Sequence, residues 1–185
     1  MPPPPRRRWN KVAVNTVVAH ASDGRWDRVE AAIAGGFPAA LTNTGSGRGV
    51  LHHAALRGHL PTTLLALAAG ACPNARDVHG WTPLWCAARR GTAGVLRALI
   101  EGGGDVNAVC AEGASPLHAL VQGATTSAAT VGGDTWDRAR VLLDQPGLQL
   151  SALCGGVTAE QWARARGATA WADVLAAEVG HNSLL

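Results

Sequence analysis

The stretch GWTPLWCAARRG, residues 80–91, combines several local signals for a short helix. Thr82 is a residue type favoured at a helix N-cap. Pro83 is tolerated in the first turn of a helix, because the N–H that it lacks would have no partner there. Ala87 and Ala88 are small and allow a neighbouring helix to approach closely. The stretch therefore predicts a short helix, and helices of about eight to ten residues are marginal alone and need neighbours on which to stack.

The landmarks of this stretch recur 33 residues apart, a spacing typical of a repeat architecture. This spacing separates Leu51, Leu84 and Leu117, and it also separates Asn74 from Asn107. The equivalent first halves read RGVLHHAALRGH (48–59) and GASPLHALVQGA (113–124), and two second halves read LLALAAGACPNA (64–75) and LRALIEGGGDVNA (96–108). Each unit thus offers two short amphipathic helices, which favours stacking of unit upon unit.

These segments resemble the ankyrin repeat, whose core pattern is G-x-TPLH-x-AA-x-x-G-H followed by GADVNA. The resemblance covers about residues 10–179. It implies an all-α solenoid of stacked helix-turn-helix units with short β-hairpin-like finger loops. Five repeats are expected, with the first and last the most divergent, as terminal caps are. Their expected bounds are 10–43, 44–76, 77–108, 109–151 and 152–179.

Three segments depart from the repeat pattern. Residues 1–9, MPPPPRRRW, are predicted to form a disordered Pro/Arg-rich tail. A ligand for a proline-reading domain and a basic nuclear-import patch remain alternative interpretations of this tail. TTSAATVGGD (125–134) is an insertion between the two helices of the fourth repeat, and we expect a flexible loop there. Residues 180–185 are expected to be a short tail.

The resemblance also predicts a partner-binding surface, because ankyrin stacks commonly bind partners across their finger tips and the exposed side of their first helices. Tryptophan and arginine are the types enriched at binding hot spots. Residues 44–108 have a net charge of +3, from six arginines against three acids, whereas residues 109–185 have −3. We therefore expect a protein partner, with an acidic one favoured. The candidate residues are Arg48, Arg57, Arg76, His79, Trp81, Arg89, Arg90 and Glu112.

Two alternative functions stay open. The first is binding of nucleic acid or another acidic ligand by the Arg-rich middle, although no aromatic-and-basic strip typical of base stacking is present. The second is an enzymatic or redox role for Cys86 or the histidines. No nucleophile motif such as G-x-S-x-G occurs, and no Cys/His spacing supplies four zinc ligands. We accordingly expect no enzyme activity, cofactor or metal.

The remaining aromatic and histidine positions favour structural roles. His52 and His118 fall on the histidine of the TPLH motif, which the resemblance implies is a hydrogen-bonding scaffold residue. Trp85 stands where that histidine is usual, so either its indole N–H replaces the imidazole or its ring fills a larger gap. Packing is the expected role of Trp26, Trp136, Trp162 and Trp171.

The four cysteines are scattered without a C-x-x-C pair, which is typical of reduced thiols in an intracellular protein, cytoplasmic or nuclear. No apolar run approaches 18 residues, so we expect no membrane span. The fold is expected to be monomeric.

Overall fold

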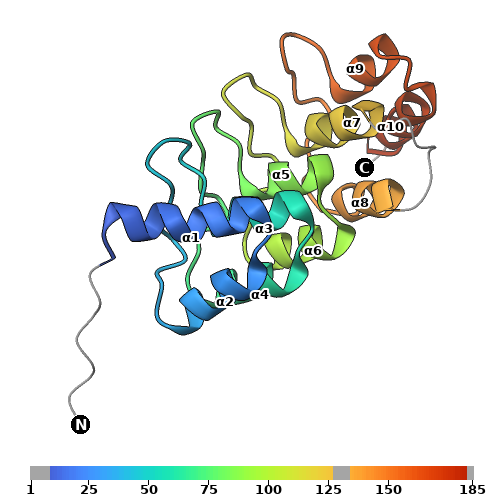
Figure 1. Cartoon of the computed structure of the whole chain (residues 1–185). Helices are drawn as coiled ribbons and strands as arrows, with labels where there is room; N and C mark the ends of the chain where they lie inside the picture. Colours follow the sequence, from blue (N-terminus) through green and yellow to red (C-terminus); the bar gives the residue numbers. More distant parts are fainter. Residues whose placement is uncertain (1–8, 127–133, 183–185) are drawn as a thin grey trace.

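The computed structural model describes residues 9–126 and 134–182. Within them the chain forms ten α-helices in five successive pairs (Figure 1). The helices are α1 (Lys11–Asp23), α2 (Trp26–Ala34), α3 (Val50–Arg57), α4 (Leu60–Ala68), α5 (Pro83–Arg90), α6 (Ala93–Glu101), α7 (Pro116–Thr126), α8 (Asp134–Leu143), α9 (Ala159–Ala165) and α10 (Thr169–Asn182).

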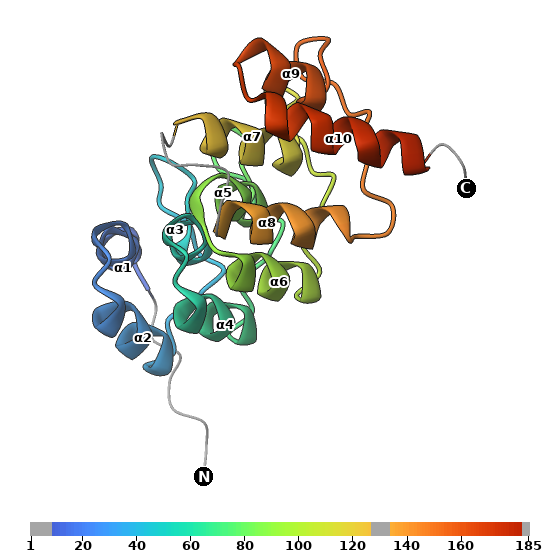
Figure 2. The same cartoon turned by 90° about the vertical axis from the view of Figure 1, so that its right-hand side faces the viewer.

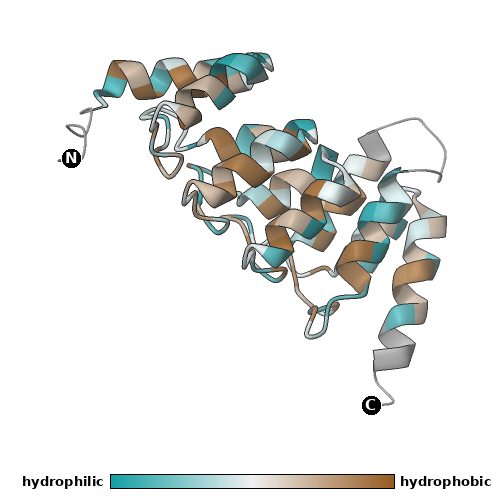
Figure 3. Cartoon of the chain, turned by 90° about the horizontal axis from the view of Figure 1, so that it is seen from below, coloured by the Kyte–Doolittle hydropathy of each residue, from teal (hydrophilic) through white to brown (hydrophobic). Residues whose placement is uncertain are grey.

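The helix pairs stack into a curved two-layer solenoid. The first helices, α1, α3, α5, α7 and α9, form one layer, and the second helices form the other (Figure 2). The helices carry both apolar and polar residues (Figure 3), and buried apolar ones form a core cluster that includes Leu84, Leu99 and Leu120. The predicted all-α solenoid is confirmed.

The helix ends form as their residue types predict. The Oγ1 of Thr82 accepts the N–H of Trp85 at 3.2 Å at the start of α5. The Oγ1 of Thr158 accepts the N–H of Gln161, whose side chain in turn accepts the N–H of Thr158, a complete capping box at α9. Such caps add to the stability of helices that are short and marginal alone.

Hairpin-like loops, which we call fingers, connect the repeats and project from one edge of the stack (Figure 1). In the finger before α5, the N–H of Asp77 donates to the carbonyl of Trp81 at 3.1 Å. Gly80 turns this finger with φ +75°, and a Cβ at Gly80 would lie 2.8 Å from the backbone nitrogen of Ala111 in the next finger. Glycine is therefore required by both the backbone conformation and the close approach.

The repeated asparagines join neighbouring repeats. The side chain of Asn74 donates to the carbonyl of Gly103 at 2.9 Å and accepts the N–H of Asp105 at 2.8 Å. Asn107 makes the same pair of bonds to Gly147 and Gln149, at 2.8 Å each. The recurrence of asparagine at a 33-residue spacing thus reflects a hydrogen-bond pair that is repeated along the stack.

Two glycines, Gly91 and Gly123, allow the neighbouring helices α3, α5 and α7 to approach one another closely. A Cβ at Gly123 of α7 would collide with the carbonyl oxygen of Arg89 in α5. A Cβ at Gly91, just after α5, would lie 2.5 Å from the carbonyl oxygen of Ala55 in α3. These contacts set how tightly repeats two, three and four can stack.

The two ends of the chain differ in part from the expected tails. Trp9, which was expected in the tail, packs its ring edge-on against Phe37 and donates its indole N–H to the carbonyl of Gly36. The expected disorder of residues 1–8 falls outside the described residues, as do 127–133 of the insertion and 183–185. Helix α10 extends to Asn182, into the segment that was expected to be a tail. No helix in the described residues is long and apolar enough to cross a membrane.

Candidate partner-binding surface

Two tryptophans and two arginines form one stack at the junction of repeats two and three. The rings of Trp81 and Trp85 are stacked, with centroids 4.3 Å apart and planes 10° apart. The guanidinium of Arg48 lies 5.0 Å from the Trp81 centroid, and that of Arg89 lies 5.5 Å from Trp81 and 5.6 Å from Trp85. We call these four residues the palm stack. Both arginines are within the range of cation–π attraction.

The local sequence explains the stack. Trp85 and Arg89 are four residues apart and lie on one face of α5. Trp81 lies two residues before the first residue of α5, and its ring stacks on that of Trp85. Trp85 is 3% exposed, whereas Trp81 and Arg89 are half-buried and border solvent. His79 adds an exposed ring whose centroid is 5.0 Å from that of Trp81. The structure thus brings His79, Trp81, Arg48 and Arg89 together, as one predicted surface requires.

Asp77 anchors the Arg48 side of the stack, and sequence reasoning did not single it out. Its side chain is fully buried, and its Oδ2 pairs with the Nε of Arg48 at 2.9 Å. Its Oδ1 accepts the N–H groups of His79 and Trp81, both at 2.9 Å. The only sequence signal for this role is that Asp77 lies three positions before Gly80, the glycine that turns the finger. Because of this pair, the charge of Arg48 is largely neutralised within the fold.

Two other predicted arginines bond to backbone carbonyls between repeats. Arg57 donates to the carbonyl of Ser22 at the end of α1. Arg76 donates to the carbonyls of Gly80 and Val109, which links two neighbouring fingers. Both side chains are exposed, yet their donors are already used in holding repeats together.

The last two predicted residues, Arg90 and Glu112, are exposed. The side chains of Arg90 and Glu112 form no hydrogen bond or ion pair with any described residue, and Arg89 likewise forms no ion pair. Glu112 lies on the finger before α7, one repeat beyond the palm stack. No carboxylate of the described residues neutralises Arg89 or Arg90.

Burial makes Cys86 a poor nucleophile. It is 1% exposed, and burial is the main reason that the pKa of its thiol is raised to about 12. The thiol is therefore protonated at neutral pH, whereas nucleophilic cysteines need a lowered pKa. A redox role for Cys86 finds no support in this environment.

The histidines of the TPLH position are bonded scaffold residues. The Nδ1 of His52 accepts the N–H of Gly49 at 3.2 Å, and its Nε2 donates to the carbonyls of Ala75 and Trp81 at 3.1 Å each. His118 bonds to Ser115 and to the carbonyl of Val157. In both rings burial lowers the pKa, which favours the neutral form.

Another histidine, His53, is half-buried next to the palm stack. Burial, followed by the charge of Arg48, lowers its pKa to about 4. No group of three His, Cys, Asp or Glu side chains in the described part of the chain could hold a metal ion.

Trp85 does not replace the missing histidine by hydrogen bonding. Its indole N–H is buried, and no described atom accepts it. Its ring instead stacks on Trp81, so the gap-filling interpretation is the one that the structure supports. An unpaired buried donor costs about 1–3 kcal/mol. The packing of two large rings offsets this cost, and it creates the palm stack.

The tryptophans outside the palm stack pack as expected. Trp26 stacks on His59 with centroids 4.5 Å apart, and Trp136 stacks on Trp171 at the same distance. Trp162 lies against His118, with centroids 5.4 Å apart.

Besides Asp77, sequence reasoning missed a second buried charge, Arg138 of α8. Its guanidinium donates to the carbonyl of Ala88 in α5 at 2.8 Å and to Thr135 at 3.0 Å. Burial lowers its pKa, and only 8% of its side chain is exposed. Nothing in the repeat pattern marks this position, because the bond joins residues 50 apart.

Comparisons with known proteins agree with this architecture. The family model for ankyrin repeats (3 copies) matches residues 17–110 and 51–131. The E3 ubiquitin-protein ligase KEG of Arabidopsis thaliana is 32% identical over 99 residues, which cover 54% of this chain and 6% of that protein. An ankyrin repeat-containing protein of Schizosaccharomyces pombe, P1E11.10, is 39% identical over 64 residues, which cover 35% of this chain and 31% of that protein.

The RelA-associated inhibitor of Mus musculus is 36% identical over 69 residues, which cover 37% of this chain and 8% of that protein. This chain thus spans less than a third of each of these relatives, and the likeness concerns the repeats alone. Ankyrin repeats generally mediate protein–protein interaction and are typically non-enzymatic. Because the family model matches more than half of the chain, and the fold is a stack of helix pairs with finger loops, this protein belongs to the ankyrin repeat family.

Proposed function

We propose that this chain is an interaction module that binds an acidic segment of a partner protein across the palm stack and the neighbouring finger tips. The observation that carries the proposal is a tryptophan pair bordered by Arg89, a guanidinium without a carboxylate partner among the described residues. An incoming carboxylate would supply that partner. Charge-assisted hydrogen bonds of this kind contribute about 1.5–3 kcal/mol.

The residues of this surface then have different roles. Arg89, Arg90 and Trp81 contact the partner. Arg48 and Arg76 hold the fingers in place through Asp77 and the carbonyl of Val109, and they contribute contact area. His79 and Glu112 extend the surface along two fingers, and Arg57 lies at its other edge. The RelA-associated inhibitor, a relative named for its association with another protein, supports a binding role.

Nucleic acid fits this surface less well. Trp81 lies against Trp85 and within cation–π range of both arginines, so base stacking would have to displace these contacts. Its binding would also fall steeply with salt, because each neutralised phosphate releases counterions.

The test is selection of peptide ligands by display on the immobilised chain, followed by affinity measurement for each selected peptide. The palm variant, Arg89→Glu/Arg90→Glu, reverses the positive charge of Arg89 in the palm stack and of Arg90 next to it in the sequence. The matched control Arg28→Glu/Arg97→Glu makes the same change in net charge at exposed residues of the second helices, α2 and α6.

We expect the selected peptides to be acidic and to lose at least about tenfold in affinity for the palm variant, equivalent to about 1.4 kcal/mol. The control variant should bind them within about twofold. Thermal melts of both variants check folding. Peptides that bind the palm variant as tightly as the parent chain would show that the proposed surface is wrong.

A further inference from the structure

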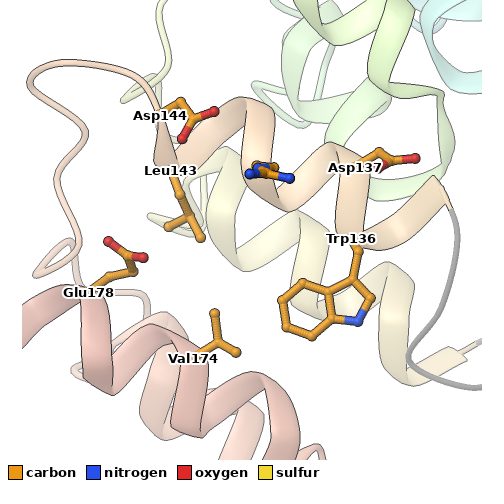
Figure 4. A pocket seen from close by; sticks show the side chains of 7 residues that line it. Trp136, Asp137, Leu143, Asp144, Val174 and Glu178 are labelled. Atoms are coloured by element: carbon orange, nitrogen blue, oxygen red, sulfur yellow. The ribbon is translucent and has the colours of Figure 1, made fainter.

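A groove lies between α8 and α10, away from the palm stack, with a volume of about 530 Å³ (Figure 4). In the layer of second helices, α2 packs on α4, α4 on α6 and α6 on α8, whereas α10 packs mainly on α9. This layer is therefore less closely packed between α8 and α10. Trp136 and Leu143 of α8 and Val174 of α10 form the apolar lining. Trp136 is stacked on buried Trp171, which fixes its ring.

The charged lining of the groove is predominantly acidic. Asp137, Asp144 and Glu178 contribute three carboxylates, and Arg140 contributes one positive charge. None of these four side chains forms an ion pair with another described residue. Figure 4 shows Asp144 and Glu178 near one end of the groove, beside Leu143, and Trp136 towards the other. The groove thus offers an aromatic ring towards one end and the two carboxylates of Asp144 and Glu178 towards the other.

The basic, proline-rich segment of this chain has the complementary chemistry. Residues 2–8, PPPPRRR, contain four prolines, three arginines and no acid. Proline-rich segments favour the polyproline II conformation and dock on aromatic-lined grooves. Arginine pairs with carboxylates, often through two parallel hydrogen bonds. We propose that the groove binds residues 2–8 of a second copy of this chain.

The spacing supports this occupant. Trp136 and Asp144 are eight positions apart, which corresponds to about 12 Å along a helix at ~1.5 Å per residue. A polyproline II segment covers this distance in about four residues, at ~3.1 Å per residue. Pro3 stacked on Trp136 therefore places Arg7 beside Asp144 and Glu178, and Pro4 likewise places Arg8 there.

The occupant comes from another molecule because the distance within one chain is too long. The segment joins the domain at Trp9, next to α1, whereas α10 lies at the far end of the stack (Figure 1). Neighbouring stacked helices lie ~8–10 Å apart, so α1 and α9 are separated by about 32–40 Å over four steps. Eight fully extended residues span at most about 29 Å. Each contact therefore joins the tail of one molecule to the groove of another.

Two uncharged variants of the full chain test the contact by sedimentation velocity at low salt. The groove variant is Asp144→Asn/Glu178→Gln, and the tail variant is Arg6→Gln/Arg7→Gln/Arg8→Gln. The parent should show concentration-dependent association, and each variant alone should weaken it about tenfold, because exposed charge pairs are lost. An equimolar mixture should form a dimer, since the intact tail of the groove variant meets the intact groove of the tail variant.

The matched control is Asp27→Asn/Glu101→Gln, which removes two exposed carboxylates outside the groove and should associate like the parent. A labelled peptide of residues 1–8 should bind the parent and bind the groove variant about tenfold more weakly.

Three outcomes would overturn the proposal: a parent that stays monomeric up to about 0.5 mM, a groove variant that associates like the parent, or a mixture that remains monomeric. This inference does not depend on the proposed function of the palm stack, and the palm variant should leave the self-association unchanged.

Discussion

Replacing the buried carboxylate of Asp77 should destabilise the chain more than any other single change at the palm stack. In Asp77→Ala, the N–H groups of His79 and Trp81 lose their acceptor, and Arg48 loses its only ion-pair partner among the described residues. Each hydrogen bond to a charged group contributes about 1.5–3 kcal/mol. Water can reach the exposed finger and replace part of this loss, so we expect about 3 kcal/mol, a decrease of roughly 6–12 °C in Tm for a chain of this size.

The assay is urea denaturation followed by circular dichroism, on a double-mutant cycle with Arg48→Met. Arg48→Met keeps much of the aliphatic packing over Trp81 and removes the charge, and we expect a cost of about 1 kcal/mol. The double variant should cost less than the sum of the single variants, by about 1–2 kcal/mol, because the carboxylate and the guanidinium act as a pair. A cost below about 1 kcal/mol for Asp77→Ala, or additive single costs, would refute this account.

Two further predictions concern close packing and pH. Gly123→Ala places a Cβ against the backbone carbonyl of Arg89, which cannot move without shifting α5, so the unfolding free energy should fall by about 2–3 kcal/mol in urea. In the control Gly94→Ala in α6, the new Cβ would lie 3.6 Å from the Cδ2 of Leu60, an ordinary van der Waals contact. This change should be neutral or stabilising by up to about 1 kcal/mol. For His53, the folded pKa of about 4 lies below the usual 6.5, so the unfolded chain binds the proton first as the pH falls. Stability should be fully present above about pH 6.5, decrease between pH 6.5 and 4, and depend less on pH in His53→Gln; urea midpoints that stay constant across this range would contradict the assignment.

The repeat architecture was predictable because its signals are local and recur. Caps such as Thr82, the finger turn at Gly80, and leucines and asparagines 33 apart each follow from a rule that acts within a few residues or between adjacent repeats. The all-α solenoid expected from these signals was confirmed, with helices from α1 to α10 in the described residues.

The sequence could not predict which arginines bond to neighbouring repeats and which stay unpaired, because these contacts join residues far apart in the chain. Arg57 and Arg90 are 33 residues apart and occupy equivalent places in their repeats, yet among the described contacts only Arg57 reaches a helix-end carbonyl, that of Ser22. The buried position of Arg138 likewise depends on a carbonyl 50 residues away. Composition and spacing contain no information on which donor meets which acceptor, so the sequence could not separate the arginines that join repeats from Arg89 and Arg90.

The anchoring of α8 has a consequence for protein engineering. Arg138 fixes this helix to the carbonyl of Ala88, and the Oδ1 of Asp134 accepts the N–H of Ala93 at 3.4 Å, so α8 takes its register from repeat three. The length of the connection from α7 is then not needed to set that register. A reporter, a tag or a whole domain inserted after Thr126 should leave the stack intact, which makes this position a permissive insertion point in an otherwise closely registered chain.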